Sequence, residues 1–242
     1  MTTLVSAELY ERYSVALGAA SDIAIASIEA CAGMSASELE TAYVAIVTRL
    51  AGVTAEVARE FYEAQRDLEA ELDDYEPQAY VSADEPLLRY DVANSSIAAL
   101  SGLAQQRIME SADNTIYRNM RKDPAKVKWA LVPHAGACAW CRLMGSNGFM
   151  YSREYGRGEG MRHANCRCTM VADFDAENPS LAGYDDSALF KEYRQARAEV
   201  ESDAQAEWSS MGAEQRAAYK AKGRGAYDHF LRNRIVARMH AN

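Results

Sequence analysis

Four cysteines and one histidine form two short patterns in the middle of this chain. The first is Cys138-Ala-Trp-Cys141, and the second is His163-Ala-Asn-Cys166-Arg-Cys168. Zinc in proteins prefers four thiolate or imidazole ligands in a tetrahedron, and a Cys-x2-Cys turn supplies two of them. The second pattern can supply the other pair, so the segment between the patterns only has to bring the chain back.

Five candidate ligands compete for the four positions around one ion. Alternate residues of an extended segment share a face, so Cys166 and Cys168 can both reach the metal. His163 is then either a ligand or a neighbour of the ligands. The sequence therefore predicts one structural zinc ion, which would contribute folding free energy to a segment with little core of its own. The ligands are drawn from one set: Cys138, Cys141, His163, Cys166 and Cys168.

Two other arrangements of the sulfurs stay open. The four clustered cysteines can form two disulfides between the patterns, or they can remain free thiols. The N-terminus lacks a basic leader followed by an apolar run, so no secretory signal is expected. A reducing compartment favours metal over disulfides. Cys31 stands alone near the end of an apolar helical pattern and is expected to be a small buried side chain.

Helices are predicted on both sides of the cysteine patterns. Abundant alanine, scarce proline and apolar residues at helical spacing indicate a mainly α protein. The expected fold is a helical body with a small β-strand and zinc-binding insert (α+β). Three regions follow from this pattern: N-terminal helices over 1–125, the insert over 126–172, and C-terminal helices over 173–242.

Capping residues predict the helix ends in the first region. A helix is expected over 6–32. Ser35 and Glu38 form a capping box for the next helix, which Gly52 is expected to end. Thr54 is then expected to cap a third helix.

Further boundaries lie closer to the cysteines. Ser82 and Glu85 predict a second capping box, which opens a helical stretch that runs to about 122 with a break near Asn94. Alternation and β-branched residues predict strands at 126–132, 149–152 and 167–172. The last predicted helices cover 187–208, 211–222 and 226–239.

Charge is unevenly distributed along the 242 residues, whose net charge is −9. Residues 1–100 carry 18 acidic and five basic side chains. Two later stretches are basic: 118–168 has ten basic and three acidic residues, and 214–242 has seven and two. Such segments can contact DNA phosphates without reading sequence, in a salt-sensitive way. No stretch approaches the roughly 20 apolar residues of a membrane span, so no membrane contact is expected.

The segment 129–168 resembles the Mu F-like minor head proteins of tailed phages, especially the actinobacteriophage branch. The family pattern is a Cys-x2-Cys, a variable loop with glycine and an aromatic residue, and His-x-Asn-Cys-Arg-Cys. All of these elements stand here, with Gly148-Phe-Met-Tyr151 in the loop. Ala164 replaces the usual proline, which is a mild departure. Outside these 40 residues the resemblance is one of helical layout alone.

The resemblance implies a structural protein present in few copies, inside the capsid near the portal. It would act in head assembly and in DNA packaging or delivery, after a stage in the host cytoplasm. Its expected partners are the portal protein, the major capsid protein, or both, and packaged DNA through the basic segments 118–168 and 214–242. Some relatives carry fused C-terminal toxin or protease domains, and none is expected in the roughly 70 helical residues that follow the motif here.

Other functions stay open beside this one. A Cys–His pair can act as nucleophile and base in a maturation protease, and a metal nuclease could use His163 and Asn165. Four clustered cysteines suit a metal better than a single activated thiolate, and 160–172 contains no acidic ligand for a hydrolytic metal. The protein is therefore expected not to be an enzyme. A DNA-binding adaptor is a further alternative.

Overall fold

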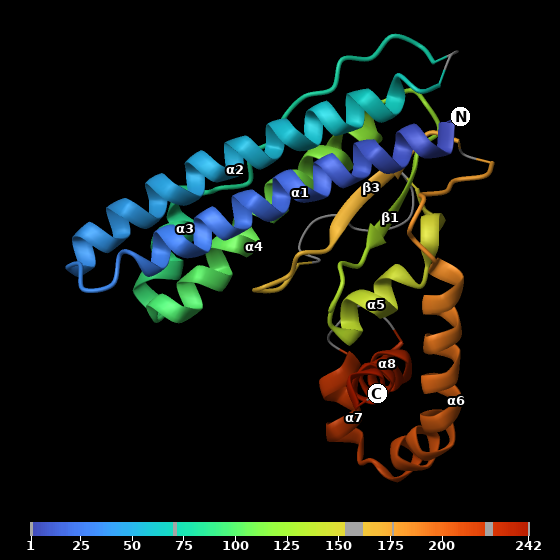
Figure 1. Cartoon of the computed structure of the whole chain (residues 1–242). Helices are drawn as coiled ribbons and strands as arrows, with labels where there is room; N and C mark the ends of the chain where they lie inside the picture. The colour runs from blue at the N-terminus through green and yellow to red at the C-terminus, as the bar shows by residue number, and fades with distance from the viewer. Residues whose placement is uncertain (1, 70–71, 153–161, 176, 221–224, 242) are drawn as a thin grey trace. The chain divides into compact units, whose positions relative to one another are not determined.

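The computed structural model describes residues 2–69, 72–152, 162–175, 177–220 and 225–241 (Figure 1). Over these ranges the protein is mainly α-helical with a small antiparallel sheet, so the predicted fold class is confirmed. Internal contacts divide the chain into two compact units. One contains residues 1–134 and 149–184, and the other contains 135–148 and 185–242. The three regions expected from the sequence stay a prediction.

Long helices and a small sheet build the first unit. Helices α1, α2 and α4 pack against one another, and strand β3 packs against α2 and α4. Their buried apolar side chains form one continuous core. The elements are α1 (Thr2–Glu29), α2 (Ala36–Arg66), α3 (Glu85–Asn94), α4 (Ile97–Lys122), β1 (Lys128–Val132), the 3-10 turn η1 (Gly148–Met150), β2 (Tyr151–Ser152) and β3 (Thr169–Asp173).

The sheet has the order β2-β1-β3, with both pairings antiparallel. Trp129 of β1 is fully buried, and its ring stacks on that of Tyr151 in β2 with centroids 4.3 Å apart. At the far end of β1, Val132 pairs with Thr169, the first residue of β3. The three predicted strands are present, although β2 is only two residues long.

Helix α2 continues where the sequence predicted a break, so the expected end at Gly52 and cap at Thr54 are wrong. A side chain at Gly52 would meet nothing within 4 Å. The Thr54 hydroxyl instead lies 3.2 Å from the carbonyl of Ala51 and 2.5 Å from that of Ile108 on α4. Packing of α2 against α1 and α4 outweighs the roughly 1 kcal/mol that one glycine costs a helix.

Two other predicted helix boundaries are confirmed. Ser35 caps α2, and Glu38 completes the capping box by accepting the Ser35 N–H at 2.9 Å. The expected break near Asn94 separates α3 from α4, and the Ser96 hydroxyl caps α4 by accepting the N–H of Ala99.

The predicted capping box at Ser82 is wrong, because this residue belongs to an extended segment that lies along α4. Every second backbone N–H of segment 78–82 donates to an α4 side chain, at 2.8–3.0 Å. The acceptors stand four residues apart on the helix: Ser111, Thr115 and Asn119. Two extended residues advance the chain by about 6.6 Å and four helical residues by about 6 Å, so the two periods match.

One described helix, α2, is long and apolar enough by composition to cross a membrane, contrary to expectation. Its buried face, which includes Tyr43, Val47, Phe61 and Tyr62, packs into the core of the first unit. Much of its apolar surface thus belongs to the core of the first unit.

The second unit is helical. It consists of α5 (Ala139–Gly145), α6 (Asp186–Ser210), α7 (Ala213–Lys220) and α8 (Ala226–Ala241). Rings of Tyr219, Tyr227 and Phe230 surround Trp208 with centroids 5.5–5.9 Å away. The three predicted C-terminal helices are present, although 221–224 lie outside the described residues. Helix α5 was not predicted.

Candidate metal centre

Cys138 and Cys141 belong to the start of helix α5 rather than to an open turn. Cys138 is the N-cap residue, with extended backbone angles of φ −64° and ψ 160°. Cys141 lies in the first helical turn and is 2% exposed. This local helix fixes the spacing between the two sulfurs.

The second pattern leads directly into β3. Cys166 and Cys168 are 3% and 0% exposed. The Cys166 N–H donates to the carbonyl of His163 at 3.2 Å, which closes a turn between them. The Nδ1 atom of His163 lies 2.8 Å from the Ala164 carbonyl oxygen. Because a carbonyl only accepts, Nδ1 carries the proton there and Nε2 is the ring nitrogen left for a metal.

The sheet register explains how two patterns so far apart in sequence come together. Val132 pairs with Thr169, so β1 ends where β3 begins. Cys168 directly precedes this pair on one strand, and Cys138 follows it after six residues on the other. Antiparallel pairing thus places Cys168 at the end of the sheet from which the chain continues toward Cys138.

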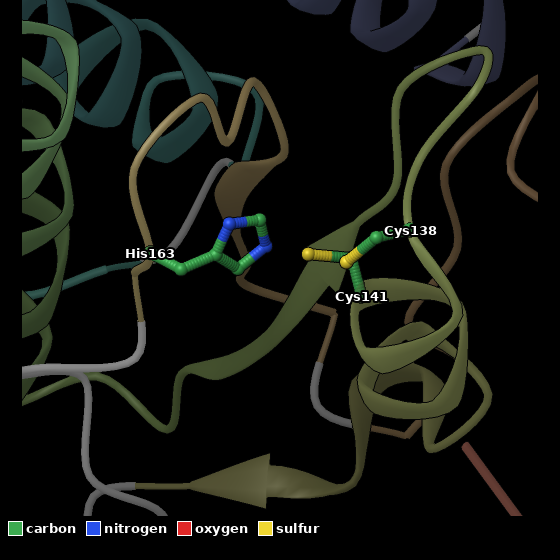
Figure 2. Close-up of side chains that lie close together, drawn as sticks. All are labelled: Cys138, Cys141 and His163. Atoms are coloured by element: carbon green, nitrogen blue, oxygen red, sulfur yellow. The ribbon is translucent and has the colours of Figure 1, made fainter. Parts of the chain in front are cut away.

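The candidate ligand atoms form two overlapping trios. One trio is Cys138, Cys141 and His163, and Figure 2 shows the imidazole facing the two sulfurs. The other is Cys141, Cys166 and Cys168. Within each trio all ligand atoms lie within 4.8 Å of one another. The structure therefore brings together all five residues that the sequence singled out, with Cys141 common to both trios.

The donor set fits a metal ion. Two thiolates on a tetrahedral zinc, each about 2.3 Å from the ion, would be about 3.8 Å apart. Separations of up to 4.8 Å are therefore close to a bound geometry. None of the five cysteines forms a disulfide, so the structure does not adopt the disulfide alternative. Cys31 is buried away from the cluster, as expected, and its thiol donates to the Ser27 carbonyl at 3.2 Å.

A buried ion pair beside the cysteines was missed from the sequence. Arg162 and Asp113 of α4 form a two-pronged pair with N–O distances of 2.5 and 2.6 Å, and both side chains are 2% exposed. Burial lowers the pKa of Arg162, but Asp113 and the sulfurs of Cys166 and Cys168 outweigh burial and hold it above its ordinary value. The guanidinium is therefore charged. Arg162 adjoins the motif in sequence, but no spacing signal connects it to Asp113.

Some arginines of each basic segment are paired with acidic side chains, and in 118–168 these include Arg142, Arg162 and Arg167. In 214–242, Arg234 and Arg238 of α8 pair with Glu207 and Glu199 of α6. In 118–168, four basic residues near the end of α4 are exposed: Arg118, Arg121, Lys122 and Lys126. Residues 153–161 of this segment, like 221–224 and 242 of the other, lie outside the described residues.

These features define a mainly α-helical protein with a thiol-rich cluster that can bind a metal. Residues 6–196 match the VG15 protein family, a stretch that contains most of the first unit and every candidate ligand. Because this is more than half of the chain, the chain belongs to the VG15 protein family, and it is a phage-derived protein. No curated protein and no solved structure matches it.

Proposed function

We propose that this chain is a structural minor head protein of a tailed phage, of the Mu F-like type. It would lie inside the capsid near the portal and act in head assembly and in DNA packaging or delivery. The observation that carries the proposal is membership of a phage protein family over residues 6–196. The Mu F-like motif over 129–168 lies within that stretch and supports the finer assignment.

The cysteine cluster would hold one structural zinc ion. Structural zinc sites are closed by four protein ligands, whereas catalytic sites keep one position open for water or substrate. Five clustered candidates are enough to close the site, and three of the sulfurs are buried. Thiolate and imidazole donors match the preference of zinc. A closed site favours a structural role over a protease or nuclease.

Contact with packaged DNA would use the end of α4 more than α8. Arg118 and Lys122 flank the ring of Tyr80, at 5.3 and 4.8 Å from its centroid, and both side chains are exposed. Arg234 and Arg238 of α8 are partly neutralised by Glu207 and Glu199. Charge reversal of Arg118 and Arg121 should therefore weaken salt-sensitive binding to random DNA more than reversal of Arg234 and Arg238.

The test is made in the phage genome that encodes this chain. Purified particles are searched for peptides of the protein, and heads are counted as full or empty by electron microscopy. The proposal expects the protein in particles, and fewer full heads when it is deleted. A protein that is abundant in infected cells but absent from particles would overturn the structural role.

A matched pair of cysteine variants then tests the metal. Cys141→Ser removes the one sulfur common to both trios, whereas Cys31→Ser changes a buried cysteine away from them. Elemental analysis should find about one zinc per chain in the wild type and in Cys31→Ser, and a large loss in Cys141→Ser. Full heads should fall together with zinc. If Cys141→Ser instead abolishes a hydrolytic activity while zinc and stability persist, the enzyme alternative replaces this one.

A further inference from the structure

The guanidinium of Arg162 is in contact with the cysteine pattern as well as with Asp113. Nε and Nη2 donate to the two carboxylate oxygens of Asp113. The remaining terminal nitrogen, Nη1, donates to the backbone carbonyl of Cys168 and lies 3.7 Å from the sulfur of Cys166. One planar group thus links α4 to both cysteines of the Cys-x-Cys segment.

Helix α4 holds the same segment at two further points. Gln106 Nε2 donates to the Arg162 carbonyl at 3.3 Å. At Gly102 an added Cβ would lie 2.9 Å from Asn165 Oδ1, so the turn reaches α4 where a side chain would clash. Asn165 itself has a φ of +64°, which is uncommon for a residue other than glycine. These contacts hold the turn against α4.

We propose that Arg162 is a positioning residue for the metal centre, an inference that rests on the proposed metal site. Its Nη1–H donates to the Cys166 sulfur, and its bond to the Cys168 carbonyl fixes the backbone from which the second sulfur projects. Asp113 holds the guanidinium in the orientation that allows both contacts. Groups that orient metal ligands in this way commonly change metal affinity 10- to 100-fold when they are removed.

The experiment uses the full chain, stripped of metal under reducing conditions and titrated with cobalt(II). Cobalt bound to thiolates gives charge-transfer and visible bands that report the number and geometry of the sulfur ligands. Arg162→Met should weaken cobalt binding at least tenfold and change these bands. Arg162→Lys retains the charge but lacks the planar fork, so it should restore little of the affinity.

Arg107→Met is the matched control. Arg107 lies on α4 and, like Arg162, forms a two-pronged ion pair with a buried aspartate, here Asp91 at 3.0 and 3.1 Å. The Arg107→Met substitution should lower thermal stability but leave the cobalt bands and the cobalt affinity unchanged. If Arg162 only stabilised the fold, Arg162→Met would likewise lower thermal stability and leave the cobalt bands and affinity unchanged.

The outcomes separate the two proposals. A folded Arg162→Met with the wild-type spectrum and affinity overturns the role of Arg162 and leaves the metal site intact. If Arg162→Met does not fold, Arg162→Lys takes its place, and a folded Arg162→Lys with the wild-type spectrum and affinity overturns the role of Arg162. If the wild-type chain takes up no cobalt, the metal site fails, and the role of Arg162 fails with it.

Discussion

The two units differ in their arginine ion pairs: among the described residues, buried pairs occur in the first unit and only more exposed pairs in the second. In the first unit, three arginines pair with aspartates whose side chains are no more than 5% exposed: Arg66–Asp123, Arg107–Asp91 and Arg162–Asp113. Arg59 and Arg89 of the same unit also pair with exposed glutamates. In the second unit, the partners are glutamates whose side chains are 32–47% exposed: Arg197–Glu201, Arg234–Glu207 and Arg238–Glu199.

This difference indicates which interactions stabilise each unit. Removing one member of a buried pair leaves an uncompensated charge, which is strongly destabilising. Exposed pairs are screened by water and salt and contribute little. The buried pairs therefore fix the positions of elements in the first unit. The second unit depends more on its apolar cluster around Phe230 and Ile235 and on the rings that surround Trp208.

The largest expected effect is at Asp123. Its buried carboxylate accepts from Arg66 Nε at 2.9 Å and from the Tyr62 hydroxyl at 3.1 Å. Asp123→Ala should lower the free energy of unfolding by about 3–5 kcal/mol, because it leaves the charge of Arg66 largely uncompensated. Denaturant unfolding followed by circular dichroism measures this. Glu207→Ala in the second unit is the control, and an equal loss there would refute the contrast between the units.

Asn119 should have the next largest effect. It holds the extended segment by accepting from the Gln78 N–H at 2.8 Å and the Tyr75 hydroxyl at 2.9 Å, and it donates to the Gln78 carbonyl at 2.7 Å. Asn119→Ala should cost about 1–3 kcal/mol and speed amide exchange over 75–82. The control is Asn94→Ala at the exposed end of α3, where little change is expected. Unchanged exchange over 75–82 would show that other contacts hold the segment.

Local signals explain what the sequence could predict. The capping box at Ser35 and the cysteine spacing depend on neighbours along the chain, so the N-terminus of α2 and the five candidate ligands could be named in advance. The continuation of α2 through Gly52 depends on packing against other helices, which no capping rule contains. The Arg162–Asp113 pair joins residues 49 positions apart and follows no repeat. Helix α5 was missed because a Cys-x2-Cys pattern indicates a turn as readily as a helix start.

A smaller effect is expected at Trp208 in the second unit. Its ring meets those of Tyr219, Tyr227 and Phe230 in tilted or edge-on contacts. Trp208→Ala should cost about 1–2 kcal/mol, in line with aromatic contacts of this kind. Hydrogen exchange should accelerate in α6, α7 and α8, and the change should exceed that in Phe190→Ala, an exposed aromatic on the same helix. Equal effects of the two variants would show that the aromatic cluster is not a stabilising feature.

The smallest effect concerns pH. The side chains of Gln195 and Arg238 lower the pKa of Glu199, and Arg197 lowers that of Glu201, below the ordinary value of 4.5. A carboxylate with a depressed pKa in the folded state stabilises the protein above its unfolded pKa, and this contribution is lost as the pH falls through the folded pKa. Stability of the second unit should therefore decline slightly below pH 4.5.

The double variant Glu199→Gln and Glu201→Gln separates this contribution from other acid effects. Neutral glutamines cannot titrate, so the part of the decline due to these two pairs should disappear, and high salt should reduce it in the wild type as well. Thermal melts at two pH values and two salt concentrations measure both effects. A salt-insensitive decline that survives in the double variant would place the acid sensitivity in buried groups, which is the behaviour expected of the first unit rather than the second.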